Sequence, residues 1–233
     1  MESEPNNIVL PRRDKDGNYY ISYSQISTFK DKESYNLKVL GKIEYMAAYF
    51  FGDSWPDSGF AQFGLEVEDY ICNGAFAENF TAEERKVLDS IEPLGNFQVE
   101  TKIWLFPNVY IKGYIDDSIP SLEHIRDYKT ASMNSKAKYY KDSYIQLDMY
   151  AMHVLQETKK LPEKLEVCII QRTGNCFGMV NRRDLLKVGE QVWYHERETS
   201  MERINQIKAD LRATVYEISE VYKLFLKLNN IKY

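Results

Sequence analysis

Two acidic segments and a lysine in the middle of the chain have the types and spacing that suit hydrolysis at a phosphate. The segment IRDYKTA (125–131) has the composition of a β-strand, and alternate side chains of a strand point to the same face. Asp127 and Lys129 therefore share a face with Ile125. An acid and a lysine at the end of an apolar strand are costly to bury unless each is paired or bound. A hard cation would satisfy Asp127, and a phosphate oxygen would satisfy Lys129.

A second acidic pair ends the preceding segment, GYIDD (113–117). Asp116 and Asp117 point to opposite faces of a strand, so only one of them can join Asp127. If the two strands are neighbours, two carboxylates come within reach of one Mg²⁺, which proteins hold with one or two carboxylates, waters and substrate phosphate. Such an ion polarises the phosphoryl oxygen and lowers the pKa of bound water. Lys129 would steady charge on the phosphate or position the attacking water.

Each of these pieces also has an ordinary structural interpretation. A D-x-K pattern on a strand commonly forms a surface ion pair, and a pair such as Asp116-Asp117 commonly marks a turn. Their order on strands that follow each other in the chain favours the catalytic interpretation over these alternatives.

The elements that position these residues are predicted from periodicity, capping residues and turn residues. The strands are expected over 97–106, 109–117, 122–131, 164–173 and 176–180. The helices are expected over 22–32 with a cap at Ser22 or Ser24, 59–74 closed by Asn73-Gly74, 81–91 with a Thr81/Glu84 capping box, 139–158, and onward from a Thr199/Glu202 capping box. A loop is expected from Phe50 to Gly59.

This pattern predicts an α/β fold with a central mixed β-sheet flanked by helices and a long C-terminal helix. The expected organisation is a flexible leader (1–20), a core (21–198) and the C-terminal helix (199–233). Packing of that helix on its own domain is favoured, and self-association of two chains through it is the alternative. Its seven-residue stripe, with Thr214 as the polar position, consists of Ile204, Ile207, Leu211, Thr214, Ile218, Val221, Phe225 and Leu228.

The composition narrows the class of protein. The net charge of −5 argues against a protein that coats DNA through bulk positive charge, so contact with DNA would depend on a local patch or on bound metal. The three cysteines, Cys72, Cys168 and Cys176, form no CxxC motif, which argues against a disulfide framework or a zinc site. A polar start and the lack of a long apolar run predict a cytoplasmic protein with no membrane segment.

Taken in order, the motifs resemble the PD-(D/E)XK nuclease superfamily, and in particular its RecB-like branch of phage and CRISPR-associated exonucleases. The resemblance covers residues 20–180 and implies a restriction-endonuclease-like core. It is carried by G-x-x-D at Gly113 and Asp116, D-Y-K-T at 127–130, and Q-L-x-x-Y from Gln146 to Tyr150.

The resemblance implies a role for each residue of the acidic centre. Asp116, Asp127 and the backbone carbonyl of Tyr128 would hold Mg²⁺ or Mn²⁺, and Lys129 would be the catalytic lysine. In that branch an early helix carries G-x-x-x-H or an acid in place of the histidine, which here gives Glu68 as a third metal ligand.

Two details of this assignment stay open. Glu66 competes with Glu68 for the helix ligand, although half a helical turn separates the two. Relatives often bind an iron–sulfur cluster through four cysteines, but Lys30-Asp31-Lys32 stands where the first would lie, so no cluster is expected.

Supporting residues are implied on two helices. Gln146 and Tyr150 are one turn apart and share a helix face, which would contact the backbone or the catalytic lysine. The alternative is an ordinary buried polar pair in a core helix. Ser22 and Ser24, with Phe29 nearby, match an amino-terminal S-x-S motif that would support the site or contact DNA, with a simple helix cap as the alternative.

Lysines and tyrosines follow the D-x-K segment and suit contact with a nucleic-acid backbone and stacking on bases. Lys136 and Lys138 stand beside Tyr139, with Tyr140 and Lys141 directly after them. A solvated helix start is the alternative interpretation. Further candidates for DNA contact are Arg172, Arg182 and Arg183.

These observations predict a metal-dependent DNA exonuclease that acts on linear or single-stranded ends. The resemblance places it in recombination, repair or phage DNA processing, with a phage-encoded protein acting in a bacterial host as one form. An endonuclease on the same core is the second hypothesis. A non-catalytic DNA-binding or assembly protein is the third, and the complete acid–acid–lysine set argues against it.

Overall fold

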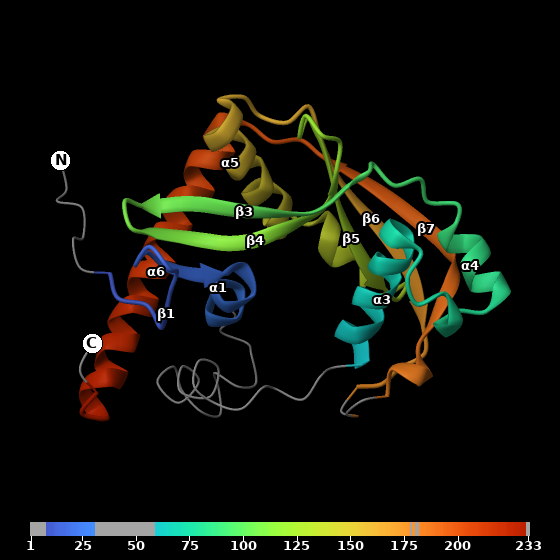
Figure 1. Cartoon of the computed structure of the whole chain (residues 1–233), viewed down its shortest axis with the longest axis horizontal. Helices are drawn as coiled ribbons and strands as arrows, with labels where there is room; N and C mark the ends of the chain where they lie inside the picture. Colours follow the sequence, from blue (N-terminus) through green and yellow to red (C-terminus); the bar gives the residue numbers. More distant parts are fainter. Residues whose placement is uncertain (1–7, 31–58, 178, 180–181, 232–233) are drawn as a thin grey trace. The chain divides into compact units, whose positions relative to one another are not determined.

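The computed structural model describes residues 8–30, 59–177, 179 and 182–231 (Figure 1). Strands in the middle of the chain form a mixed sheet, helices flank it, and one long helix ends the chain, so the predicted fold class is confirmed. The expected loop from Phe50 to Gly59 lies outside the described residues except for Gly59, which begins a helix.

The described strands pair in the order β1-β2-β4-β5-β6-β7, and β3 pairs with β4. The β2–β4 and β5–β6 pairs are parallel, whereas the β1–β2, β4–β5 and β6–β7 pairs are antiparallel. The strands are β1 (Arg12–Arg13), β2 (Tyr19–Ser22), β3 (Asn96–Phe106), β4 (Val109–Ser118), β5 (His124–Ala131), β6 (Lys164–Thr173) and β7 (Lys187–Arg197).

The helices match the predicted ones in order, with different bounds at several ends. They are α1 (Tyr23–Lys30), α3 (Gly59–Asn73), α4 (Ala82–Leu88), α5 (Gln146–Thr158) and α6 (Met201–Leu228), with short 3₁₀ helices η1 (Ala77–Asn79), η2 (Lys136–Tyr140) and η3 (Arg183–Leu185). The predicted capping box is present, since Thr81 and Glu84 exchange side-chain and backbone hydrogen bonds. None of the helices in the described ranges combines the length and the apolar run that crossing a bilayer requires.

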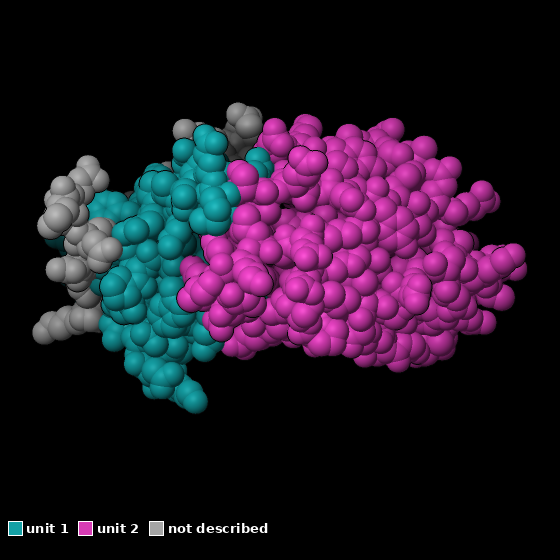
Figure 2. Space-filling model, turned by 90° about the horizontal axis from the view of Figure 1, so that it is seen from above, with its two compact units in different colours: residues 1–55, 101–113, 201–233 teal, residues 56–100, 114–200 magenta. Residues whose placement is uncertain are grey.

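The chain divides into two compact units (Figure 2). The first comprises residues 1–55, 101–113 and 201–233, and the second comprises residues 56–100 and 114–200. In the first unit α6 packs against α1, and the backbone N–H of Val9 donates to the hydroxyl of Ser219 at 2.9 Å.

The apolar stripe of α6 is largely buried. Of the predicted stripe, Val221 is half-buried and Leu228 is 63% exposed, while Tyr222 and Leu226 are buried in their place. The helix begins at Met201, so Ser200 rather than the predicted Thr199 precedes it. The remaining positions are buried as predicted, namely Ile204, Ile207, Leu211, Thr214, Ile218 and Phe225.

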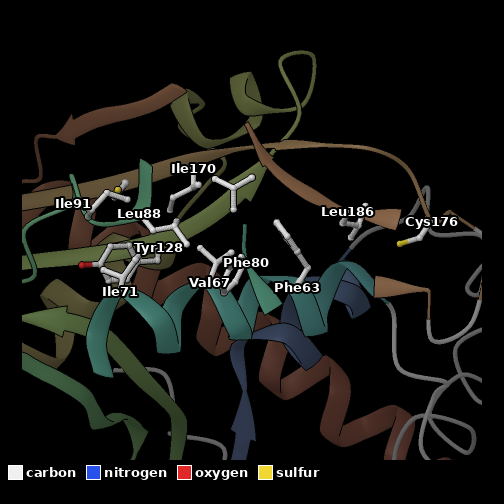
Figure 3. Packing of buried hydrophobic residues seen from close by; sticks show 12 residues of the cluster. Phe63, Val67, Ile71, Phe80, Leu88, Ile91, Tyr128, Ile170, Cys176 and Leu186 are labelled. Atoms are coloured by element: carbon white, nitrogen blue, oxygen red, sulfur yellow. The ribbon is translucent and has the colours of Figure 1, made fainter. Parts of the chain in front are cut away.

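The core of the second unit lies where α3 and α4 pack on β5, β6 and β7 (Figure 3). Tyr128 of β5 joins this cluster, so its neighbours Asp127 and Lys129 point to the opposite face, against which α5 packs. The cluster comprises Phe63, Val67, Ile71, Phe80, Leu88, Ile91, Tyr128, Cys168, Ile170, Cys176, Leu186 and Val188.

The helix predicted over 139–158 begins only at Gln146, so this boundary was wrong. Before it lies η2, and the N–H of Tyr144 then donates to the carbonyl of Lys141 at 3.0 Å and closes a turn. The turn contains Asp142 and Ser143, whose side chains compete with the helical backbone for hydrogen bonds. Tyr144 consequently stands outside the helix, at its entrance.

The strand predicted over 176–180 was also wrong. The described residues Cys176, Phe177 and Met179 are not in a strand, and the partner of β6 is β7. This strand is last in the sheet order, and edge strands often carry charged residues that hide the alternating pattern. In β7, Gly189 and several charged residues hide the alternation of apolar and polar side chains.

Asp117 is fully buried and connects three segments of the second unit. Its Oδ1 accepts the N–H of Gly95 at 3.1 Å, and its Oδ2 accepts the N–H of Leu94 at 2.7 Å and the hydroxyl of Tyr128 at 2.8 Å. The carboxylate therefore holds the segment before β3 against β4 and β5.

Asp117→Ala should lower the free energy of unfolding by about 3 kcal/mol, because three donors lose a charged acceptor. Urea unfolding followed by circular dichroism measures the change. Asp89→Ala is the matched control, since that exposed carboxylate accepts one side-chain hydrogen bond, from Tyr70, and should cost less than about 1 kcal/mol. Equal effects of the two substitutions would contradict the structural role of Asp117.

Candidate active site

The candidate site forms where β4 and β5 stop pairing. Their register joins Asp117 to Arg126 and Ser118 to Ile125, and Asp116 and Asp127 come one residue beyond it. There the backbone of Tyr128 binds side chains. Its N–H donates to Oδ2 of Asp116 at 2.9 Å, and its carbonyl accepts from Nζ of Lys129 at 3.0 Å. The end of the pairing thus brings Asp116 and Lys129 to the edge of β5.

The ammonium of Lys129 lies among three oxygen atoms. It is 2.7 Å from Oδ1 of Asp127, 3.0 Å from the carbonyl of Tyr128 and 3.6 Å from Oδ2 of Asp116. These three groups are the ones that the motif resemblance implies for the metal ion. The structure therefore brings the predicted acids and lysine together around one positive charge.

Burial sets the electrostatics of this centre. Asp127 is fully buried and Asp116 is 8% exposed. Burial raises the pKa of Asp116 well above its usual value, and the nearby carboxylates of Asp127 and Glu68 add to the rise while Lys129 opposes it. For Lys129, burial disfavours the charged form, but Asp127 and Asp116 outweigh that effect and raise its pKa. The two acids therefore favour the charged form of Lys129.

Glu68 faces this centre from α3. Its carboxylate accepts a hydrogen bond from the side chain of Gln98. Burial raises the pKa of Glu68, Lys129 and the Gln98 hydrogen bond lower it, and Asp127 raises it further. The charges of Lys129 and Asp127 on β5 therefore change the pKa of Glu68.

Glu66 has a different environment on the same helix. It is 5% exposed, forms an ion pair with Arg183, and accepts a hydrogen bond from Gln62 at 2.9 Å. Arg183 also lies over the rings of Phe63 and Phe80. The surroundings of Glu66 are those of a structural ion pair, which favours Glu68 over Glu66 as the residue for the site.

The entrance and first turn of α5 approach Asp127. The hydroxyl of Tyr150 is 3.4 Å from Oδ1 of Asp127, and Nε2 of Gln146 donates to that hydroxyl at 2.5 Å. The predicted shared face of Gln146 and Tyr150 therefore looks toward the acidic centre, where it contacts a carboxylate. Tyr144, which the sequence analysis did not single out, donates from its hydroxyl to Oδ2 of Asp127 at 2.6 Å. The Asp142-Ser143 turn was the signal that could have revealed it.

The residues predicted to contact DNA after β5 pack on aromatic rings. Nζ of Lys136 lies 3.8 Å from the centre of the Trp193 ring, and Nζ of Lys138 lies 4.7 Å from that of Tyr139. Tyr139 is buried, and its ring meets that of Tyr144 edge to face. Its ring therefore supports Tyr144 in this structure.

Three arginines and two serines complete the predicted set. Arg172 lies over the ring of Phe60, Arg182 pairs with Asp184, and Arg183 pairs with Glu66. Ser22 ends β2 and Ser24 lies in the first turn of α1, both in the first unit. The hydroxyl of Ser22 accepts the N–H of Gln25, and the Gln25 side chain accepts the N–H of Ser22, which is the geometry of a helix cap.

The donor set fits a hard divalent ion. Within the described ranges, no three His, Cys, Asp or Glu side chains lie close enough to hold a metal ion among themselves. Mg²⁺ needs fewer protein ligands than that, because it keeps several waters and uses one or two carboxylates plus substrate phosphate. Asp116, Asp127 and the Tyr128 carbonyl converge on one cation, the lysine ammonium, and all three are oxygen ligands of the kind that Mg²⁺ takes.

Comparison with known proteins gives a likeness of structure only. No protein family and no curated protein matches the sequence. The structure resembles the crystal structure of a "putative exonuclease" from Eubacterium rectale, with a TM-score of 0.52 and 16% identity over 95% of this chain and 86% of that one. It also aligns with a "phage related exonuclease" from Haemophilus somnus 129PT, with a TM-score of 0.49 and 13% identity over 91% and 97% of the two chains. The first likeness shows that the two proteins share a fold.

The two glutamates of α3 should respond differently to loss of charge. Glu66→Gln should lower the free energy of unfolding by about 3 kcal/mol, because it breaks a buried pair and leaves the charge of Arg183 without its partner. Glu68→Gln should change it by less than about 0.5 kcal/mol, because the raised pKa of Glu68 means that the folded protein already disfavours its charged form. Chemical denaturation at neutral pH measures both, and a larger loss for Glu68→Gln would reverse the assignment.

Proposed function

We propose that this protein is a metal-dependent nuclease that hydrolyses phosphodiester bonds in DNA. The observation that carries the proposal is the convergence of Asp116, Asp127 and the Tyr128 carbonyl on the ammonium of Lys129. The order of the motifs supports it, and so does the shared fold with a protein named "putative exonuclease".

In this proposal, Asp116, Asp127 and the Tyr128 carbonyl hold Mg²⁺ or Mn²⁺. When bound, the ion polarises the scissile phosphate and lowers the pKa of the attacking water. Glu68 faces the same centre from α3 and is the candidate for a third acidic ligand, through a bound water, because the three acids are too far apart to share one ion directly. Asp117 takes no part, because its carboxylate is committed to three donors on the other side of the strand.

Lys129 supplies positive charge for the phosphate. Its side chain is 22% exposed, whereas that of Asp127 is fully buried. As an ammonium it would neutralise the charge that develops on a phosphoryl oxygen.

An exonuclease acting on linear or single-stranded ends is the form that the motif resemblance favours, in recombination, repair or phage DNA processing. An endonuclease with the same catalytic centre is the second candidate, because the acids and the lysine serve both modes of cutting. A non-catalytic DNA-binding or assembly protein is the third candidate, and the complete acid–acid–lysine set argues against it.

Lys129→Ala should reduce cleavage of DNA by about 10²–10³-fold or more, because the transition state loses a preorganised positive charge. Binding of DNA should remain largely intact, since one phosphate contact among several is lost. A gel assay with Mg²⁺ and a filter-binding assay without metal measure the two effects. The control is Lys164→Ala, which removes a lysine paired with Glu166 and Glu196 and should leave cleavage unchanged. Undiminished cleavage by Lys129→Ala would remove the lysine from the mechanism.

The mode of cutting can be tested with one DNA sequence in linear and closed circular form. Cleavage of both candidate types should require Mg²⁺ or Mn²⁺ and stop with EDTA, because the carboxylates bind no phosphate without a cation. An exonuclease should degrade only the linear form, whereas nicking of the circle would establish the endonuclease. Cleavage that persists in EDTA would contradict the metal-dependent mechanism, and DNA binding without any cleavage would support the non-catalytic candidate.

A further inference from the structure

We propose that Tyr144 is a positioning residue that fixes the carboxylate of Asp127 so that only one of its oxygens faces the cation. The inference rests on the proposed nuclease function and specifies how its metal site is built. It assigns a role to a residue that lies outside the D-x-K and Q-L-x-x-Y motifs.

The hydrogen bonds around Asp127 have a defined direction. Nε2 of Gln146 donates to the hydroxyl of Tyr150, which leaves the proton of that hydroxyl for Oδ1 of Asp127 at 3.4 Å. The hydroxyl of Tyr144 lies 2.6 Å from Oδ2 of Asp127 and 3.1 Å from Oε1 of Gln146, and its single proton goes to the closer, charged acceptor. Both tyrosines therefore donate toward the same buried carboxylate.

The two oxygens of Asp127 consequently have different tasks. Oδ2 accepts the short bond from Tyr144, whereas Oδ1 faces the ammonium of Lys129 at 2.7 Å and has Tyr150 at 3.4 Å. Oδ1 would therefore be the oxygen of Asp127 that holds a cation, because Oδ2 already accepts the bond from Tyr144. Tyr144 thus holds Asp127 in a one-oxygen mode of binding and prevents the carboxylate from rotating.

Tyr144 can do this because its backbone is held independently of α5. The turn that carries it is closed by its N–H and the carbonyl of Lys141. The same carbonyl accepts the guanidinium of Arg197, a buried side chain of β7, at 2.6 Å. The ring of Tyr139 packs edge-on against the ring of Tyr144, with 5.1 Å between their centres. Because both the backbone and the ring of Tyr144 are held in place, its hydroxyl can orient a carboxylate.

The test measures metal binding in the absence of DNA. Tyr144→Phe should raise the dissociation constant for Mn²⁺ about 10-fold, as loss of a partner that orients a metal ligand does in other proteins. Titration calorimetry or the electron paramagnetic resonance signal of free Mn²⁺ gives the constant. Tyr150→Phe should have a smaller effect, because its contact with Asp127 is longer.

A matched control removes the same chemical group elsewhere in the second unit. The hydroxyl of Tyr70 donates to the carboxylate of Asp89 at 2.9 Å, so Tyr70→Phe also breaks a tyrosine–aspartate bond. Tyr70→Phe should leave the dissociation constant for Mn²⁺ unchanged. In cleavage assays Tyr144→Phe should raise the Mg²⁺ concentration for half-maximal rate and leave the KM for DNA unchanged.

Replacement of Tyr144 by para-aminophenylalanine, which keeps a donor at the same position, should restore the Mn²⁺ constant to near the wild-type value. Should Tyr144→Phe not fold, para-methylphenylalanine fills the volume of the hydroxyl without donating and takes its place. An affinity that stays weak with the amine would overturn the inference, since the donor would then not be the cause.

The outcomes separate this inference from the proposed function. Wild-type protein that binds Mn²⁺, together with Tyr144→Phe that binds it equally well, would overturn the role of Tyr144 and leave the nuclease proposal standing. Wild-type protein that neither binds Mn²⁺ nor cleaves DNA in its presence would overturn both.

Discussion

The backbone of Tyr128 is the constraint on which the site depends. An N–H and a carbonyl in a buried strand must find partners, and β4 no longer supplies them at this residue. The carboxylate of Asp116 and the ammonium of Lys129 take the place of the missing strand. The groups that complete the hydrogen bonds of the fold are therefore the same groups that the proposed chemistry would use.

Two pairs of acidic residues that lie close in the sequence have different surroundings in the structure. Asp116 and Asp117 are neighbours, but one faces the acidic centre and the other binds three donors toward the core. On α3, Glu66 pairs with Arg183 while Glu68 faces the charges of β5. In each pair the structural residue has its partners supplied within the chain. In the other residue, burial raises the pKa of the carboxyl group, and a nearby bound cation would lower that pKa again.

The part of the site that could be predicted from the sequence is the part that follows from the alternation of side chains along a β-strand. Asp127 and Lys129 share a strand face, and Asp116 follows from strands adjacent in the chain. Tyr144 could not be found this way, because the apolar pattern of 139–158 hides a turn whose position depends on Asp142 and on tertiary contacts of Lys141 with Arg197. The strand β7 was missed for a related reason, since an edge strand tolerates charges that a central strand excludes.

Tyr128 also couples the site to the core. Its side chain belongs to the apolar cluster on the α3 face, and its hydroxyl binds Asp117, while its backbone binds Asp116 and Lys129. A shift of the ring would therefore move both backbone partners, and with them the oxygen atoms proposed for the metal. Because close-packed interiors resist such shifts, the packing of α3 against β5 gives the site the rigidity that preorganised charge requires.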